Sequence, residues 1–211
     1  MARTGLSERR RERRLATVNE AAYVAGVSTR AVNQAIDRNE IRTYVLRSEG
    51  DLRGRALGGA ELVYLRVNAL LSSKARKAVY RVLSGFDFDA VPPVIEMEGA
   101  VRLDIREPLA EVRARLDELE RINARVQVHP EIRGGEPVFR GTRIPVHMIA
   151  EFLRQGVPRA ELLEDYPSLD EAALEAATRY AELYPRRGRP KDAPWRSREP
   201  THRFTPEELR G

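Results

Sequence analysis

The sequence contains no cysteine, and it has only one tryptophan and three histidines in 211 residues. A chain without cysteine has neither a disulfide framework nor a thiolate metal site. The histidines, His129, His147 and His202, lack the spacing of metal ligands, and no serine stands in a recognisable nucleophile context. The sequence therefore predicts a protein that is not an enzyme and that holds no metal or cofactor.

Long apolar runs are also missing. No segment approaches the length of a membrane span, and the first residues, MARTGLSERRRERR, lack the apolar core of a secretory signal. A cytoplasmic protein is the simplest interpretation, and the length allows one large domain or two small ones.

Charges of both signs are abundant but unevenly distributed. Residues 1–14 hold six Lys/Arg against two Asp/Glu, residues 30–86 eleven against five, and residues 186–203 seven against two, which gives +4, +6 and +5. Residues 87–128 hold six against ten and residues 141–185 four against eight, so each is −4. Basic segments attract phosphate backbones or acidic protein sites, and acidic segments repel nucleic acid. The alternative is ordinary solvated arginine without a partner.

The N-terminal half begins with a predicted pair of short helices. Thr17 and Glu20 form the T-x-x-E pattern of a capping box, which predicts a helix over 18–25. Gly26-Val27 is a turn, and Ser28 is a good N-cap for a second helix over 29–38. Two short helices joined by a glycine turn predict a helix-turn-helix.

The pattern after this pair predicts a wing. Ile41 to Arg47 and Leu52 to Leu57 are strand-like around the turn Glu49-Gly50-Asp51, and a helix is predicted over 60–71. With Ala21-Ala22, Gly26-Val27-Ser28 and Val32 as the matching residues, residues 16–72 resemble a winged helix of the excisionase and MerR type.

The second helix of the pair is the predicted recognition helix. Val32, Ala35 and Ile36 share one face with the spacing of buried residues, which leaves the polar side chains free to reach base edges. Basic residues on the strands are expected to contact phosphate. The predicted DNA-binding residues are Thr29, Arg30, Asn33, Gln34, Arg38, Arg42, Arg47, Arg53 and Arg55. A structural helix pair with a solvated polar face is the alternative.

The middle of the chain predicts a hairpin and a long helix. Val94 to Glu98 and Ala100 to Ile105 alternate around Gly99, and Pro108 can occupy the first turn of a helix that runs to about Ile122. The apolar stripe of this helix predicts packing in a core, with dimerisation as the alternative.

A block rich in glycine and proline follows, His129 to Val146, HPEIRGGEPVFRGTRIPV. Gly134-Gly135 and Arg140-Gly141-Thr142 bracket a short β-type run, Pro137-Val138-Phe139. Glycine supplies positive φ and proline fixes φ, so this block specifies one backbone path and its role is expected to be architectural. Three short helices are predicted after it, over 146–155, 158–166 and 170–183.

Motifs in this region carry a second resemblance. They are His129-Pro130-Glu131-Ile132, Gly134-Gly135-Glu136-Pro137-Val138, Arg140-Gly141-Thr142-Arg143-Ile144-Pro145-Val146, Gly156, Tyr166-Pro167-Ser168-Leu169 and Ala177-Thr178-Arg179-Tyr180-Ala181. With these residues the segment from about Val128 to Pro185 resembles the bacterial family filed as domain of unknown function 433. The resemblance implies an antitoxin of the VapB type, whose partner is a PIN-like ribonuclease toxin.

The C-terminal tail lacks the apolar periodicity of a folded segment but is rich in arginine, with two large aromatics. Under the antitoxin hypothesis its arginines enter the acidic metal pocket of the toxin and its aromatics make apolar contacts. The predicted toxin-binding residues are Arg186, Arg187, Arg189, Trp195, Arg196, Arg198 and Phe204. Arg187-Gly188-Arg189-Pro190-Lys191 also resembles an AT-hook for the DNA minor groove, and a plain disordered tail is the third interpretation.

The sequence as a whole predicts a mainly α protein of the α+β class. The predicted parts are a basic arm at 1–15, a winged helix-turn-helix at 16–86, a hairpin and helix connector at 87–127, a three-helix module at 128–185 and an extended tail at 186–211. The predicted function is a type II antitoxin that represses its own operon as a homodimer on operator DNA and neutralises the toxin. The alternative is a stand-alone transcriptional regulator whose C-terminal module senses a ligand or a protein.

Overall fold

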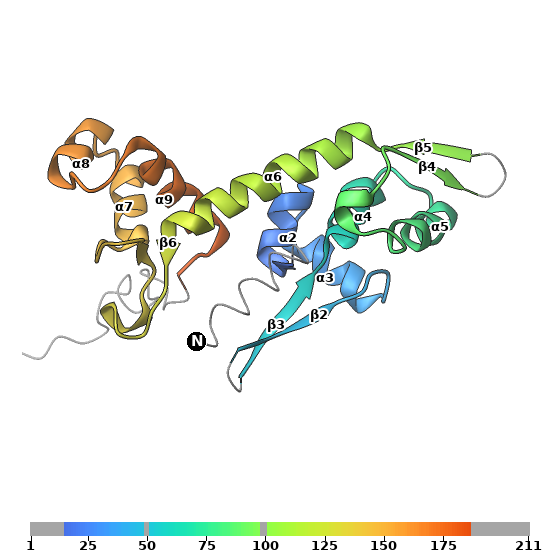
Figure 1. The fold of residues 1–211 in the computed structure, drawn as a ribbon, viewed down its shortest axis with the longest axis horizontal. Coiled ribbons are helices and arrows are strands. Elements are labelled where there is room, and N and C mark those ends of the chain that lie inside the picture. Colours follow the sequence, from blue (N-terminus) through green and yellow to red (C-terminus); the bar gives the residue numbers. More distant parts are fainter. Residues whose placement is uncertain (1–14, 49–50, 98–100, 187–211) are drawn as a thin grey trace, which may run out of the picture.

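The computed structural model describes residues 15–48, 51–97 and 101–186, so the predicted basic arm up to residue 14 and the tail from residue 187 lie outside the described chain. The described residues are mainly helical, with small antiparallel sheets (Figure 1). This confirms the predicted α+β class.

The elements have the following bounds. In chain order they are β1 (Ala16–Thr17), α2 (Val18–Ala25), α3 (Thr29–Asp37), β2 (Tyr44–Ser48), β3 (Asp51–Leu57), α4 (Gly59–Asn68), α5 (Ser73–Leu83), η1 (Phe88–Ala90), β4 (Val94–Met97), β5 (Val101–Asp104), α6 (Arg106–Arg125), β6 (Val126–Gln127), η2 (Arg133–Gly135), β7 (Val138–Phe139), α7 (Val146–Arg154), α8 (Arg159–Asp165) and α9 (Glu171–Leu183).

The N-terminal helices form where local capping predicts them. The Thr17 side chain accepts a hydrogen bond from the Glu20 backbone N–H, and the Glu20 carboxylate accepts one from the Thr17 N–H, so the capping box is present. Gly26, at φ 66°, ends α2 in the left-handed conformation, and Ser28 caps α3. The strands β1, β3 and β2 form a three-stranded sheet in that order, and α4 follows. The described elements of this half therefore follow the order helix, turn, helix, hairpin and helix.

Two boundaries in the N-terminal half differ from the prediction by three residues. The strand expected from Ile41 begins at Tyr44, because Asn39 turns the chain with φ 53° and Ile41 is buried in the core. The helix expected to reach Leu71 ends at Asn68, where the chain turns so that Ser72 can cap α5. Both differences follow from where the next element has to pack.

Helix α6 joins the two ends of the molecule. It runs diagonally from the β4–β5 hairpin to the C-terminal helices and crosses α2 and α4 (Figure 1). Its apolar stripe is buried, and the core is continuous along it; the stripe consists of Leu109, Val112, Leu116, Leu119 and Ile122. The segment predicted as a connector is thus the shared core helix.

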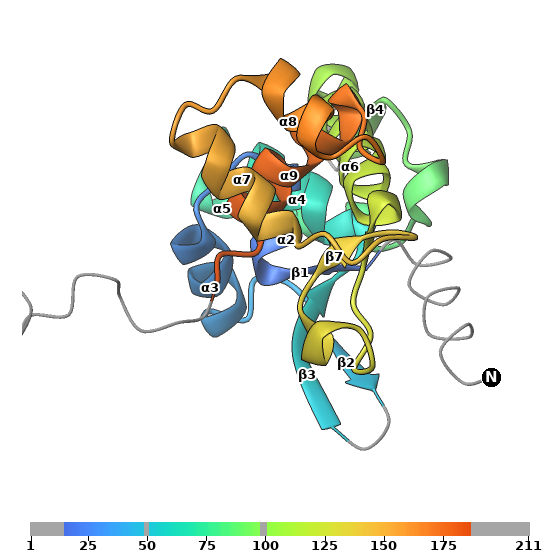
Figure 2. The ribbon, with the colours of Figure 1, turned by 90° about the vertical axis from the view of Figure 1, so that its left-hand side faces the viewer.

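The C-terminal module packs on the far end of α6. Helices α7 and α9 lie against each other, α8 follows the turn at Gly156, and α9 contacts α6 and α2 (Figure 2). The three predicted helices are confirmed. Strand β6 pairs with β7 and was not predicted, because two residues carry no periodic signal. Among the described residues, no helix is long and apolar enough to cross a membrane.

Candidate nucleic-acid interface

Helix α3 presents a polar face to solvent. Val32, Ala35 and Ile36 are buried, as predicted, and they anchor the helix on the core. The remaining polar side chains, Thr29, Arg30, Asn33, Gln34 and Arg38, are all exposed. Arginine can bond guanine with two N–H groups, and asparagine or glutamine can do the same with adenine. The structure therefore places the predicted base-reading residues on one accessible helix.

Arg115 of α6 contacts the turn before α3. Gly26 has φ 66°, and a Cβ placed there would lie 2.2 Å from Nη1 of Arg115. The same guanidinium donates to the Tyr23 carbonyl oxygen at 3.4 Å. A residue of α6, about ninety positions away in the sequence, therefore contacts the turn between α2 and α3.

The wing lies beside α3. In the β2–β3 pair, Val45 stands opposite Arg55, and Arg55 reaches to within 3.6 Å of the Asp37 carboxylate on α3. Arg55 is 57% exposed, so this pair leaves the guanidinium accessible to another anion. The side chains of Arg47 and Arg53 lie outside the described part of the chain.

Arg42 links α3 to β2 and is positioned by two other helices. Its backbone N–H donates to Oη of Tyr80 on α5 at 2.8 Å, and Tyr80 Oη donates to Oε1 of Glu61 on α4 at 2.7 Å. Glu61 is buried and also accepts from the Gly58 N–H at 3.1 Å. Burial, and then the hydrogen bond to Glu61, raise the pKa of Tyr80, so the phenol remains a neutral donor.

A basic groove lies between the end of α3 and α5. Its volume is about 510 Å³, and its charged lining consists of Arg38, Glu40, Arg42, Arg76, Lys77 and Arg81. The sequence prediction assigned no role to the α5 residues. Their spacing, Lys77 and Arg81 one helical turn apart, was a visible signal, but only the packing shows that they face Arg38 and Arg42.

The block rich in glycine and proline is hydrogen-bonded to the C-terminal end of α6. Arg140 donates from Nε to the Ala124 carbonyl at 2.6 Å and from Nη2 to the Val126 carbonyl at 3.1 Å. The guanidinium supplies hydrogen-bond donors to carbonyl groups at the C-terminal end of α6. Its positive charge also interacts favourably with the negative end of the helix dipole. Thr142 Oγ1 donates to the Phe139 carbonyl at 2.9 Å and closes the turn.

The family model for "Protein of unknown function (DUF433)" matches residues 126–181. A protein of Sinorhizobium fredii (strain NBRC 101917 / NGR234), "Uncharacterized protein y4eO", is 32% identical over 183 residues, which are 81% of this chain and 82% of that protein. This chain belongs to the same protein family as y4eO and carries a DUF433 domain. The crystal structure of a DUF433 member protein from Anabaena variabilis is 29% identical, with 55% of this chain and 91% of that chain covered and a TM-score of 0.29.

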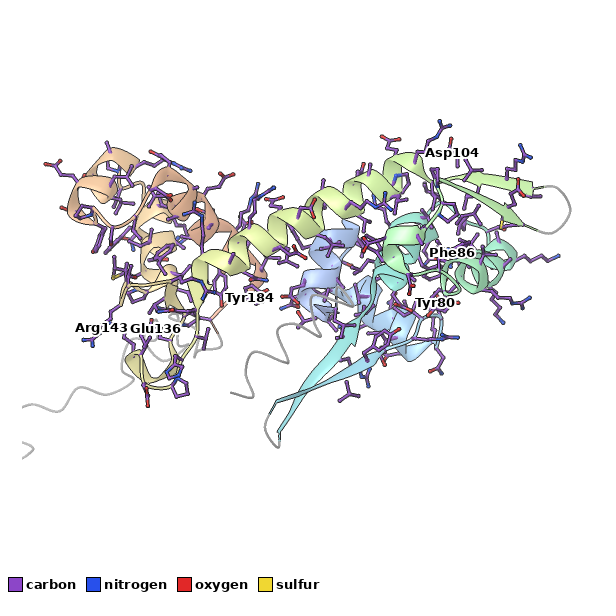
Figure 3. The ribbon with its side chains drawn as sticks, viewed as in Figure 1. Tyr80, Phe86, Asp104, Glu136, Arg143 and Tyr184 are labelled. Atoms are coloured by element: carbon purple, nitrogen blue, oxygen red, sulfur yellow. The ribbon has the colours of Figure 1, made fainter. Side chains whose placement is uncertain are left out.

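The end of α9, just after the DUF433 match, meets α2 at a partly buried junction. Tyr184, which follows α9, donates its hydroxyl to Oε1 of Glu20 on α2, and the same hydroxyl lies 3.3 Å from Oδ1 of Asn123 on α6 (Figure 3). Glu20 has no exposed surface. Asn19 donates to the Leu183 carbonyl at 3.4 Å. The first helix of the N-terminal unit is therefore bonded directly to the end of the DUF433 domain.

Contacts between aromatic rings extend from Tyr184 into the DUF433 domain. The Tyr184 ring lies 4.5 Å from that of Tyr180, and Tyr180 meets His147 edge-on at 5.7 Å. Burial, with the nearby charge of Arg186, lowers the pKa of His147, so this histidine is a neutral packing residue. In the described ranges no cluster of three His, Asp or Glu side chains is arranged to hold a metal ion.

Of the predicted toxin-binding residues, the structure describes only Arg186. Its Nη2 donates to Oε1 of Glu136 in the DUF433 domain at 2.7 Å, and Glu136 also pairs with Arg133 at 2.8 Å. The ion pair joins the last described residue to the DUF433 domain. The residues that lie outside the described chain are Arg187, Arg189, Trp195, Arg196, Arg198 and Phe204, together with the AT-hook-like segment 187–191.

Proposed function

We propose that this protein is a DNA-binding antitoxin that represses its own operon and neutralises a PIN-like ribonuclease. The observation that carries the DNA-binding half is the exposed polar face of α3, flanked by the wing through the Arg55–Asp37 contact. A helix with base-reading side chains beside a basic hairpin has the two components of sequence-specific binding, base contacts and phosphate contacts.

The N-terminal unit supports an excisionase or MerR type of winged helix. Its elements follow the order helix, turn, helix, hairpin and helix, and Gly26, Ser28 and Val32 hold the turn, the cap and the buried face. Operators in bacteria are commonly read by two-fold symmetric pairs of such units, so we propose a homodimer on the DNA.

The antitoxin half is supported by the resemblance of the DUF433 domain to VapB-type proteins and by the start of the tail. Arg186, the first of the predicted toxin-binding residues, donates a hydrogen bond to Glu136 of the domain. An arginine guanidinium can form two parallel hydrogen bonds to a carboxylate, and such ion pairs are strong. Arginine therefore suits the acidic metal pocket of a PIN-like toxin.

The DNA-binding half is tested by selecting a binding site from random duplexes and measuring affinity by fluorescence anisotropy. Arg30→Ala and Asn33→Ala should each cost about 1–3 kcal/mol on the selected site and relax its sequence preference. Arg121→Ala, on the exposed surface of α6, is the matched control. Equal binding of selected and scrambled duplexes by the unaltered protein would reject sequence-specific recognition.

The antitoxin half is tested by co-expression with an adjacent gene for a PIN-like protein. Deletion of residues 187–211 keeps the Arg186–Glu136 pair, so the shortened chain should still bind DNA but should no longer rescue growth or copurify with the toxin. Full rescue by the shortened chain would remove the tail from the mechanism.

A stand-alone regulator remains the second candidate because of the Tyr184–Glu20 contact, which connects the DUF433 domain directly to the DNA-binding unit. Such a connection suits a sensing domain that alters DNA binding. A lone gene, with no toxin copurifying from its native cells, favours this candidate over the antitoxin.

A further inference from the structure

The basic groove between α3 and α5 combines two of the predicted DNA-binding residues, Arg38 and Arg42, with basic residues of α5 to which the proposed function assigns no role. Arg38 and Arg42 enter it from the end of α3 and the following turn, and Arg76, Lys77 and Arg81 enter it from α5. Against these five cations its lining holds one carboxylate, that of Glu40. The groove is therefore strongly positive.

Most of this charge is not neutralised by the protein. Glu40 lies 3.9 Å from Arg38, and Arg76 donates through Nε to the Leu71 carbonyl at 3.2 Å. In the described part of the chain no ion pair joins a carboxylate to Arg42, Lys77 or Arg81. Cations held close together without counter-charges repel each other, and an anion bound between them relieves the repulsion.

The charged side chains that line the groove outnumber its aromatic side chains, which are Tyr64 and Tyr80. Tyr64 at its floor is 1% exposed, and the Tyr80 hydroxyl is engaged by the Arg42 N–H and by Glu61. Binding of single-stranded nucleic acid or of a nucleotide base relies on accessible aromatic faces. The lining therefore fits phosphate groups rather than bases.

We propose that this groove binds the phosphate backbone of the duplex on which α3 lies, beyond the contacts of the recognition helix and the wing. Continuity favours this occupant, because Arg38 and Arg42 belong both to the groove and to the surface around α3. Tyr80 positions Arg42 at the boundary through its backbone N–H. The inference rests on the proposed DNA binding. It extends the protein surface that contacts DNA from α3 and the wing to the groove between α3 and α5.

The salt dependence of binding measures this contact. The slope of log affinity against log salt concentration changes by about 0.9 for each phosphate neutralised on B-DNA. Replacement of Lys77 and Arg81 together should lower the magnitude of the slope by about 2. It should also lower the affinity for the selected and the scrambled duplexes by the same factor. Loss of a base contact would instead lower the affinity for the selected duplex more than the affinity for the scrambled duplex.

The experiment compares full-length Lys77→Glu/Arg81→Glu with Arg121→Glu/Arg154→Glu, which makes the same charge change on exposed positions of α6 and α7. Anisotropy titrations at several salt concentrations should show the smaller slope only in the first variant. The milder Lys77→Gln/Arg81→Gln should show the same direction, and circular dichroism should show that every variant is folded.

Equal slopes in the two charge-changed variants would overturn the groove proposal while leaving α3 recognition intact. Absence of duplex binding by the unaltered protein would overturn both proposals together. Tight binding of inorganic pyrophosphate that Lys77→Gln/Arg81→Gln abolishes, with duplex binding unchanged, would assign the groove to a free anion and would also refute the proposal.

Discussion

Replacement of Tyr184 by phenylalanine tests whether the two halves of the molecule form one energetic unit. The change removes one hydroxyl and keeps the ring that packs on Tyr180. That hydroxyl donates to Glu20, whose carboxyl group is fully buried and also accepts from the Thr17 N–H at 2.6 Å. The substitution therefore leaves a buried acceptor short of a donor.

A hydrogen bond to a charged group contributes about 1.5–3 kcal/mol, and an unsatisfied buried acceptor costs a similar amount. We expect Tyr184→Phe to lower the free energy of unfolding by about 2 kcal/mol. With a urea dependence of about 2 kcal/mol/M for a chain of this size, the midpoint of unfolding should fall by about 1 M.

The assay is urea unfolding followed by circular dichroism at pH 7. Tyr166→Phe is the control, since Tyr166 is also partly buried and its hydroxyl makes no hydrogen bond to another described residue. In a Glu20→Gln background, where the acceptor is neutral, Tyr184→Phe should cost about 1 kcal/mol less. A midpoint for Tyr184→Phe equal to that of the control, or strict additivity with Glu20→Gln, would show that the contact does not couple the DUF433 domain to α2.

Three further predictions concern separate features. Gly26→Ala should destabilise the protein by about 1–2 kcal/mol in thermal unfolding, because φ is 66° and the new methyl group meets Arg115; stability equal to wild type would contradict this. Burial, with the hydrogen bond to Glu118, raises the pKa of Tyr23 from 10.0 to about 12. The stability from its neutral phenol is present below pH 10 and should be lost as pH rises to about 12, and Tyr23→Phe should flatten this decline in urea midpoints. Arg140→Ala should cost about 1 kcal/mol in urea unfolding by uncapping α6, whereas Arg140→Lys should recover part of the loss.

Much of the fold could be predicted from local sequence patterns. The capping box at Thr17 and Glu20, the Ser28 cap and the buried spacing of Val32, Ala35 and Ile36 each involve residues within one or two helical turns. Such interactions depend only on neighbours in the chain, so the sequence predicts the helices and the exposed face of α3 directly. The DUF433 motifs are equally local, since their glycines and prolines specify one turn after another.

The tertiary structure decided how these pieces act on one another. Arg140 caps α6 from sixteen residues away, Tyr80 positions Arg42 across thirty-eight residues, and Tyr184 meets Glu20 across 164. No spacing in the sequence encodes these pairs, because they depend on how elements distant in the chain pack against one another. The sequence by itself determined most of the helices and the exposed polar face of α3. The packing of α2, α4 and α9 against α6 joined the two halves of the molecule, and only the tertiary structure brought the cations near α3 and those of α5 to the same groove.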